Sequence, residues 1–160
     1  MNIEKVINQV ITPEMDEIIQ KQELIGMRIS GGIDSAFMTY LMMSAYPNKK
    51  LLPVTMFNKQ RPAAMDAALN VESKLRELLP NSTLLEAEVA FFDTSNWKKT
   101  KEMIEEFEKT GKKYNPKDVF QQKWYEDIFK KYPELNVYMS GETLNPPVEE
   151  QPNIITDSFS

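Results

Sequence analysis

Two serines, two glycines and an aspartate stand together in residues 30–35, which read Ser-Gly-Gly-Ile-Asp-Ser. This stretch follows a short apolar run, residues 24–29, and precedes residues 36–43, which are apolar almost all round. It therefore lies between a predicted buried strand and a predicted buried helix. Backbone amides at the positive end of a helix attract anions, and adjacent glycines let the chain approach phosphate oxygens closely. The pattern predicts a phosphate-binding turn that matches neither the Walker motif nor the GxGxxG motif.

Two further polar stretches follow predicted strands. The first comes after the apolar run 51–57 and carries the basic residues Lys59 and Arg61. The second comes after the short apolar run 136–140 and carries the acidic residue Glu142. Cations offset negative charge in phosphoryl chemistry, and a carboxylate suits a hard cation such as Mg²⁺. A solvated basic loop and a β-turn with an exposed acid explain the same residues about equally well.

Around these turns, hydrophobic periodicity predicts strands and helices in alternation. Two short helices precede the first strand, a helix follows each of the first two strands, and residues 85–91 alternate as in a partly exposed strand. Amphipathic helices near 97–110 and 117–132 precede the last strand. This order predicts an α/β fold, a Rossmann-like three-layer sandwich with a mainly parallel, twisted sheet covered by helices on both faces. Ligands bind such sheets at the carboxyl ends of the strands, where both glycine turns lie.

Length and composition indicate one globular core. The 160 residues fit a single domain, with N-terminal helices in 1–23, a core in 24–145 that carries the predicted phosphate-binding turn, and a C-terminal loop or tail in 146–160. The net charge of -5 argues against a nucleic-acid partner and favours a small-molecule substrate. No apolar run approaches the roughly 20 residues that span a bilayer, so we expect no membrane partner and a cytoplasmic location.

The six residues 30–35, read as SGGxDS after a first strand, resemble the loop of the PP-loop ATP pyrophosphatases. That superfamily includes NAD synthetase, GMP synthetase, asparagine synthetase and 7-cyano-7-deazaguanine synthase. The resemblance implies a loop that grips the β and γ phosphates of ATP while a substrate oxygen attacks the α phosphorus and pyrophosphate is released. An ordinary strand-to-helix turn is the alternative interpretation.

The same resemblance assigns roles to individual residues of this loop. Asp34 would position Mg²⁺ or the loop itself, and it is both a catalytic and a metal-binding candidate. The nucleotide-binding candidates in the loop are Ser30, Gly31, Gly32, Ile33, Asp34 and Ser35.

Two other stretches extend the resemblance. Phe57 falls where the family presents backbone to the adenine, and Lys59 or Arg61 would act on the leaving pyrophosphate. Residues 57–68 also resemble, loosely, the FDYGQR stretch of 7-cyano-7-deazaguanine synthase. Residues 140–145, Ser-Gly-Glu-Thr-Leu-Asn, resemble the second nucleotide contact of the superfamily, which makes Gly141 and Thr143 nucleotide-binding candidates and Glu142 a magnesium ligand.

The chain contains no cysteine and no histidine. The lack of thiols disfavours the branches that thiolate tRNA or reduce sulfonucleotides, and the zinc-binding cysteines of 7-cyano-7-deazaguanine synthases are missing too. Without imidazole, acid/base work falls to Asp, Glu, Lys, Tyr or the substrate. Residues 30–36 share the spelling SGGIDSA with NAD synthetases, which are longer and usually dimeric, so a homodimer is one expected assembly.

The function expected from this resemblance is that of a ligase that uses ATP and Mg²⁺ and forms AMP and pyrophosphate. It would adenylate a carboxylate or carbonyl oxygen of a small-molecule acceptor before attack by ammonia, as in 7-cyano-7-deazaguanine synthase and queuosine biosynthesis. The alternatives are an NAD synthetase-like amide ligase and a nucleotide-binding module without turnover. A third is a Rossmann-like flavoprotein or stress-type domain whose turn holds AMP.

Overall fold

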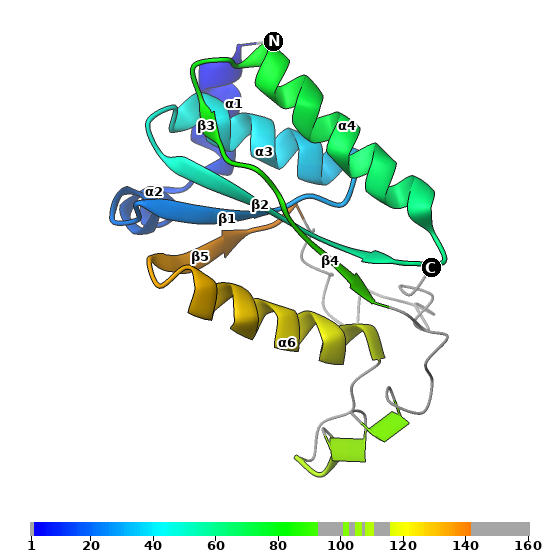
Figure 1. The fold of residues 1–160 in the computed structure, drawn as a ribbon. Coiled ribbons are helices and arrows are strands. Elements are labelled where there is room, and N and C mark those ends of the chain that lie inside the picture. The colour runs from blue at the N-terminus through cyan, green and yellow to red at the C-terminus, as the bar shows by residue number, and fades with distance from the viewer. Residues whose placement is uncertain (1, 93–100, 103–104, 107, 111–115, 142–160) are drawn as a thin grey trace, which may run out of the picture.

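The computed structural model describes residues 2–92, 101–102, 105–106, 108–110 and 116–141. Within these ranges a parallel sheet lies between two layers of helices (Figure 1). The strands are β1 Leu24–Arg28, β2 Lys50–Asn58, β3 Thr83–Leu84, β4 Glu88–Phe92 and β5 Leu135–Met139. The helices are α1 Ile3–Val10, α2 Pro13–Gln20, α3 Ile33–Ala45, α4 Pro62–Leu78 and α6 Pro116–Lys131. The predicted three-layer α/β fold is confirmed.

The sheet places β1 in its interior. The strands pair in the order β3-β2-β1-β5, and β4 also pairs with β2. Every pairing is parallel. β3 contacts the start of β2 and β4 contacts its end, so these two short strands share one edge of β2. Helices α3 and α4 follow β1 and β2 on one face, whereas α6 precedes β5 on the other face (Figure 1).

Helices α1 to α4 close a hydrophobic core on one face of the sheet. Alternate residues of β1, Ile25 and Met27, supply this core from the sheet, and Ile19 of α2 supplies it from the N-terminal helices. The hydroxyl of Tyr46, just after α3, donates to Asp16 Oδ1 of α2 at 2.6 Å. Burial, together with this hydrogen bond and the charge of Asp16, raises the pKa of Tyr46 above its usual range. The N-terminal helices therefore belong to the same packed core as the sheet.

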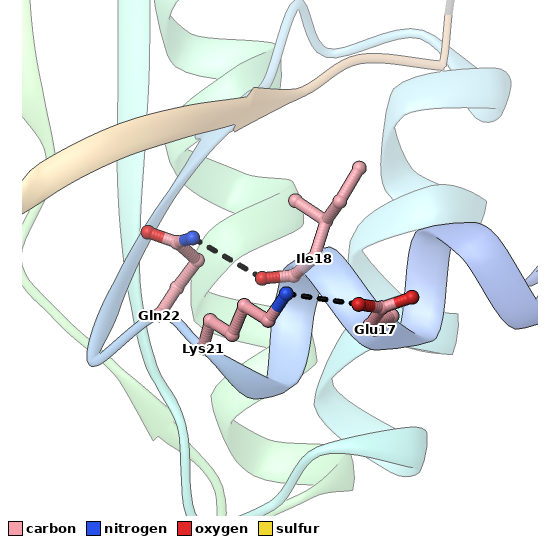
Figure 2. A network of polar contacts seen from close by, with 4 residues as sticks. All are labelled: Glu17, Ile18, Lys21 and Gln22. Carbon is pink, nitrogen blue, oxygen red and sulfur yellow. Dashed lines mark hydrogen bonds and ion pairs between the residues drawn. The ribbon is translucent and has the colours of Figure 1, made fainter.

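Short-range contacts fix the end of α2, from which the chain enters β1. Lys21 Nζ pairs with Glu17 Oε1 at 2.9 Å, and Gln22 Nε2 donates to Ile18 O at 3.1 Å (Figure 2). Lys49 Nζ donates to two backbone carbonyls at this end, at 2.7 and 2.8 Å. The last carbonyls of a helix lack intrahelical partners, so Lys49 satisfies the carbonyl of Gln20, which would otherwise depend on water. An exposed ion pair such as Lys21–Glu17 adds only a few tenths of a kcal/mol.

Helix α6 closes a second core on the opposite face. Ile128 of α6 and Leu52 of β2 are buried in it. The ring of Tyr138 on β5 lies over Gly26 of β1, where an added Cβ would collide with Tyr138 Cδ1. Phe129 meets the Tyr138 ring edge-on, with ring centroids 5.2 Å apart. Gly26 is therefore the residue that lets β5 and its tyrosine pack against the sheet.

The prediction of one continuous strand over residues 85–91 is wrong. β3 ends at Leu84 and β4 begins at Glu88. Leu85 packs in the α6 core, whereas Val89 packs in the core beneath α3 and α4. The side chains before and after the break therefore lie on opposite faces of the sheet. One continuous strand would have placed both on the same face. The guanidinium of Arg76 on α4 holds the break by donating to the carbonyl oxygens of Leu84, at 3.3 Å, and Leu85.

A carboxylate is buried on α4, on the side of the helix that packs against the sheet with Ala68 and Leu75. Glu72 is 1% exposed, and its Oε2 lies 3.7 Å from the guanidinium of Arg76. Glu72 Oε1 has no hydrogen-bond partner in the described part of the chain. Burial raises the pKa of Glu72 by more than the charge of Arg76 lowers it. Leu78, the last residue of α4, is exposed.

Two expectations about helices meet different outcomes. The helix predicted near 117–132 is present as α6. The helix predicted near 97–110 lies largely outside the described residues. Among the helices that the structure describes, none combines the length and apolar character needed to cross a bilayer.

Candidate functional site

The predicted site lies where the strand order reverses. β1 is followed by α3 on one face of the sheet, and its neighbour β5 is preceded by α6 on the other face (Figure 1). Neighbouring parallel strands whose helices lie on opposite faces leave a crevice at their carboxyl ends, and ligands bind in such crevices. The turns at 30–32 and 140–141 leave β1 and β5 at this point.

A step in the sheet borders this crevice. The ladder between β1 and β2 ends where Arg28 pairs with Val54, and Ile29 N donates to Val54 O at 3.4 Å. β2 continues to Asn58 and stays paired with β4 over this extension. At its carboxyl end, β2 therefore extends further than β1. A ligand resting on the turn after β1 would have the extension of β2 as its side wall.

Gly31 gives the turn its shape. Its φ of +85° lies in the left-handed region, which side chains with a Cβ rarely adopt. An added Cβ would lie 3.0 Å from Ala68 N and 3.1 Å from Ala67 Cβ. The turn is thus pressed against the backbone of α4. The small side chains of Ala67 and Ala68 permit this approach, a role that the sequence analysis missed although the run of alanines in α4 was visible.

Hydrogen bonds within the turn use both serine hydroxyls. Ser35 Oγ donates to Gly32 O at 3.0 Å and accepts from Ser30 N at 3.1 Å. Ser30 Oγ lies 3.1 Å from Ser35 Oγ and accepts from Gly32 N at 3.4 Å. Ser35 is buried whereas Ser30 is exposed. The geometry makes Ser35 the buried residue that holds the turn, whereas Ser30 is the exposed serine of the turn.

The start of α3 presents its amides without a side-chain cap. Asn2 and Thr12 cap α1 and α2 by accepting from backbone amides, but the capping position of α3 is Gly32, with no side-chain hydrogen bond. The first amides of a helix have no intrahelical partner, and the helix dipole favours an anion there. Ile33 and Asp34 in the first turn are exposed, Ile33 to 83%. This end of α3 can therefore accept an anion.

Gly141 brings the second predicted turn against the first. A Cβ added to Gly141 would lie 2.5 Å from both the carbonyl carbon and the carbonyl oxygen of Asp34, and 2.8 Å from Ser35 N. The chain leaving β5 thus packs directly on the first turn of α3. The structure brings together Gly141 and the turn at 30–35, two stretches of the predicted site that are far apart in sequence.

The third predicted stretch lies at the end of β2. Lys59 and Arg61 are exposed between β2 and α4, and Arg61 N donates to Asn58 O at 2.8 Å. Phe57 is buried. Backbone groups of successive strand residues point to opposite sides, and those of Val54 point to β1. By the same alternation, the backbone N–H and C=O of Phe57 point toward β4. The backbone groups of Met56 point to the other side of β2, above the end of β1, where Phe57 was expected to present its own.

Glu142 and Thr143 lie outside the described residues, so Asp34 is the described candidate for a metal ligand. In the described ranges no group of three or more acidic side chains gathers as a ready metal site. Mg²⁺ commonly takes one or two carboxylates together with the phosphates of its nucleotide. An exposed Asp34 beside an anion-accepting helix end fits that donor set, with the phosphates supplying the remaining oxygens.

Comparison with known proteins adds no family assignment. The chain matches no protein-family model, and no curated protein is similar to it in sequence. The site is therefore defined by its own geometry: a glycine turn, an uncapped helix end and a strand extension at one edge of a parallel sheet.

Proposed function

We propose that the chain binds ATP at the turn 30–35 and cleaves it between the α and β phosphates, as PP-loop enzymes do. The observation that carries the proposal is the turn itself. It combines a left-handed glycine, an uncapped helix start and a location where the strand order reverses. These three features support a phosphate ligand, and the SGGxDS spelling selects the PP-loop family among phosphate-binding folds.

The residues of the chain would share the work as follows. Backbone amides of Gly32, Ile33 and Asp34 would hold the phosphates, and Ser35 would keep the turn in shape. The Asp34 carboxylate would hold Mg²⁺, which draws charge from the phosphate oxygens. Lys59 and Arg61, exposed beyond β2, would stabilise the leaving pyrophosphate.

The proposed reaction joins a carboxylic acid to ammonia. A carboxylate or carbonyl oxygen of the acceptor attacks the α phosphorus, the bond from that phosphorus to the bridging oxygen breaks, and pyrophosphate leaves with the electron pair. For a carboxylate, ammonia then attacks the activated carbon, AMP leaves, and the nitrogen loses one proton to solvent. The result is an amide, AMP and pyrophosphate. ATP and ammonia as substrates suit a cytoplasmic location, which is part of the same proposal.

The acceptors to test follow from the two families that the turn resembles. They are 7-carboxy-7-deazaguanine, which would connect the protein to queuosine biosynthesis, and nicotinate adenine dinucleotide. The proposal includes a homodimer as the assembly to look for, as in NAD synthetases.

Isothermal titration with ATP and with a non-hydrolysable α,β analogue, both in magnesium, tests the nucleotide site. We expect Asp34→Ala and Ser35→Ala to lose binding. Matched controls remove the same groups elsewhere: Asp127→Ala on the exposed face of α6 and Ser44→Ala in the last turn of α3 should bind as wild type does. Pyrophosphate release with each acceptor and ammonium then tests turnover.

The outcomes separate the alternatives. Wild-type protein that binds no nucleotide would overturn the proposal. Binding that survives Asp34→Ala would favour a flavoprotein or stress-type domain that holds AMP. Binding that depends on Asp34 but releases no pyrophosphate with any acceptor would favour a nucleotide-binding module without turnover.

A further inference from the structure

A half-exposed phenylalanine side chain lies near the carboxyl ends of the strands, where the candidate site also lies. Phe91, next to the last residue of β4, is 49% exposed. It pairs in the ladder with Phe57 of β2, which is only 4% exposed. The two ring centroids are 6.3 Å apart and the rings are inclined by 45°. The buried ring of Phe57 therefore supports the exposed ring of Phe91 from one side.

Phe91 lies on the same edge as the phosphate turn and at a useful distance from it. β4 is two strands away from β1, with β2 between them. Strands are spaced by about 4.8 Å, so the lateral separation is roughly 10 Å. The extension of β2 beyond β1 fills the space between the two positions and stays paired with β4. The ribose and phosphate chain of a nucleotide is long enough to cross a gap of this size.

We propose that Phe91 is the platform on which the planar base of the bound nucleotide stacks. This inference rests on the proposed function, because it takes the position of the phosphates from the turn 30–35. An exposed aromatic ring gains by exchanging water for the face of a base, and Phe57 holds the ring in place. Phe91 carries no polar atom, so stacking on it accepts any base, and any selectivity for adenine comes from backbone groups such as those of Met56.

The test compares ligands with and without a base. Titrations of wild type and Phe91→Ala use ATP and inorganic pyrophosphate, both in magnesium. Stacking of a base on an aromatic side chain corresponds to roughly 5- to 150-fold in affinity. We expect Phe91→Ala to weaken ATP binding by that factor and to leave pyrophosphate binding unchanged, whereas Ser35→Ala weakens both.

Conservative variants and a distant control separate stacking from damage to the fold. Phe91→Trp should bind ATP at least as tightly as wild type. Its added fluorescence, measured as a difference from wild type, should be quenched by ATP and not by pyrophosphate. Phe129→Ala removes a comparably exposed phenylalanine from α6 and should leave both affinities unchanged.

The results that overturn the inference differ from those that overturn the proposed function. If Phe91→Ala binds ATP as wild type does while Ser35→Ala does not, the phosphate site stands and the platform is refuted. Equal weakening of ATP and pyrophosphate by Phe91→Ala also refutes the platform. Wild-type protein that binds neither ligand overturns the proposed function and this inference together.

Discussion

The shape of the turn at residues 30–35 can be tested without any ligand, through Gly31. In Gly31→Ala the new residue must take up a φ of +85°, which costs an L-residue roughly 1–2 kcal/mol. Its Cβ would also lie 3.0 Å from Ala68 N and 3.1 Å from Ala67 Cβ, so α4 or the turn has to shift. We expect the free energy of unfolding to fall by about 2–3 kcal/mol. For a domain of this size that corresponds to a decrease in Tm of roughly 4–12 °C.

The assay is urea unfolding followed by far-UV circular dichroism, with the midpoint and the m value fitted together. A change in midpoint at constant m reports a change in stability. Gly32→Ala is the matched control, because Gly32 has an ordinary φ of -83° and its added Cβ would meet only Ser30 Oγ, at 3.4 Å. Its stability should stay within about 1 kcal/mol of wild type. If Gly31→Ala is as stable as wild type, or if the two variants lose the same amount, the left-handed turn is refuted.

Four further predictions concern the turn and two carboxylates elsewhere in the fold. Ser35→Ala leaves groups of the turn without partners and should lower the free energy of unfolding by about 1–3 kcal/mol in urea titrations, whereas Ser44→Ala should change it by less. Because the pKa of Glu72 is raised in the fold, this residue stabilises the fold at pH values below the ordinary carboxyl pKa, and that contribution is lost as pH rises through the raised pKa. Glu72→Gln should therefore gain stability relative to wild type as pH increases. The pKa of Glu88 shifts in the opposite direction. Burial raises it, but the hydrogen bonds from Lys131, at the end of α6, and Tyr132, just after it, lower it by more. Glu88→Gln should therefore lose stability relative to wild type as pH rises through the acid range, and matching slopes for the two variants would contradict both assignments. Gly141→Ala places a methyl group against the backbone at the start of α3 and should weaken ATP binding several-fold in calorimetry, and an unchanged affinity would show that this contact does not position the turn.

Much of the fold could be predicted because its signals are local. The apolar runs at 24–29 and 51–57 gave β1 and β2 within a residue or two. Pro62 and Pro80 bracket α4, since proline is favoured in a first helical turn and cannot continue a helix. The glycine turn between β1 and α3 was also predicted from neighbouring residues alone, whereas phosphate binding by that turn stays a prediction.

The remainder depends on contacts between distant residues. The break between β3 and β4 is held by Arg76 of α4, and nothing in residues 85–87 signals it. Glu72 is buried because Ala68 and Leu75 lie on the same side of α4, so helical spacing contained the signal, but polarity argued against it. The contacts of Gly31 with α4 and of Gly141 with α3 bring together residues that no local pattern connects.

The contact between Gly141 and the start of α3 has a consequence for the order of assembly during synthesis. The six residues of the turn leave the ribosome before Gly141, which follows only after α6 and β5 have been made. Until β5 docks, β1 lacks one of its two neighbours and the start of α3 lacks the backbone that packs on it. Domains generally fold as units, so an emerging chain would carry the complete motif before the turn has its final support. If the proposed nucleotide binds only chains in which β5 has docked, it favours the completed fold by mass action.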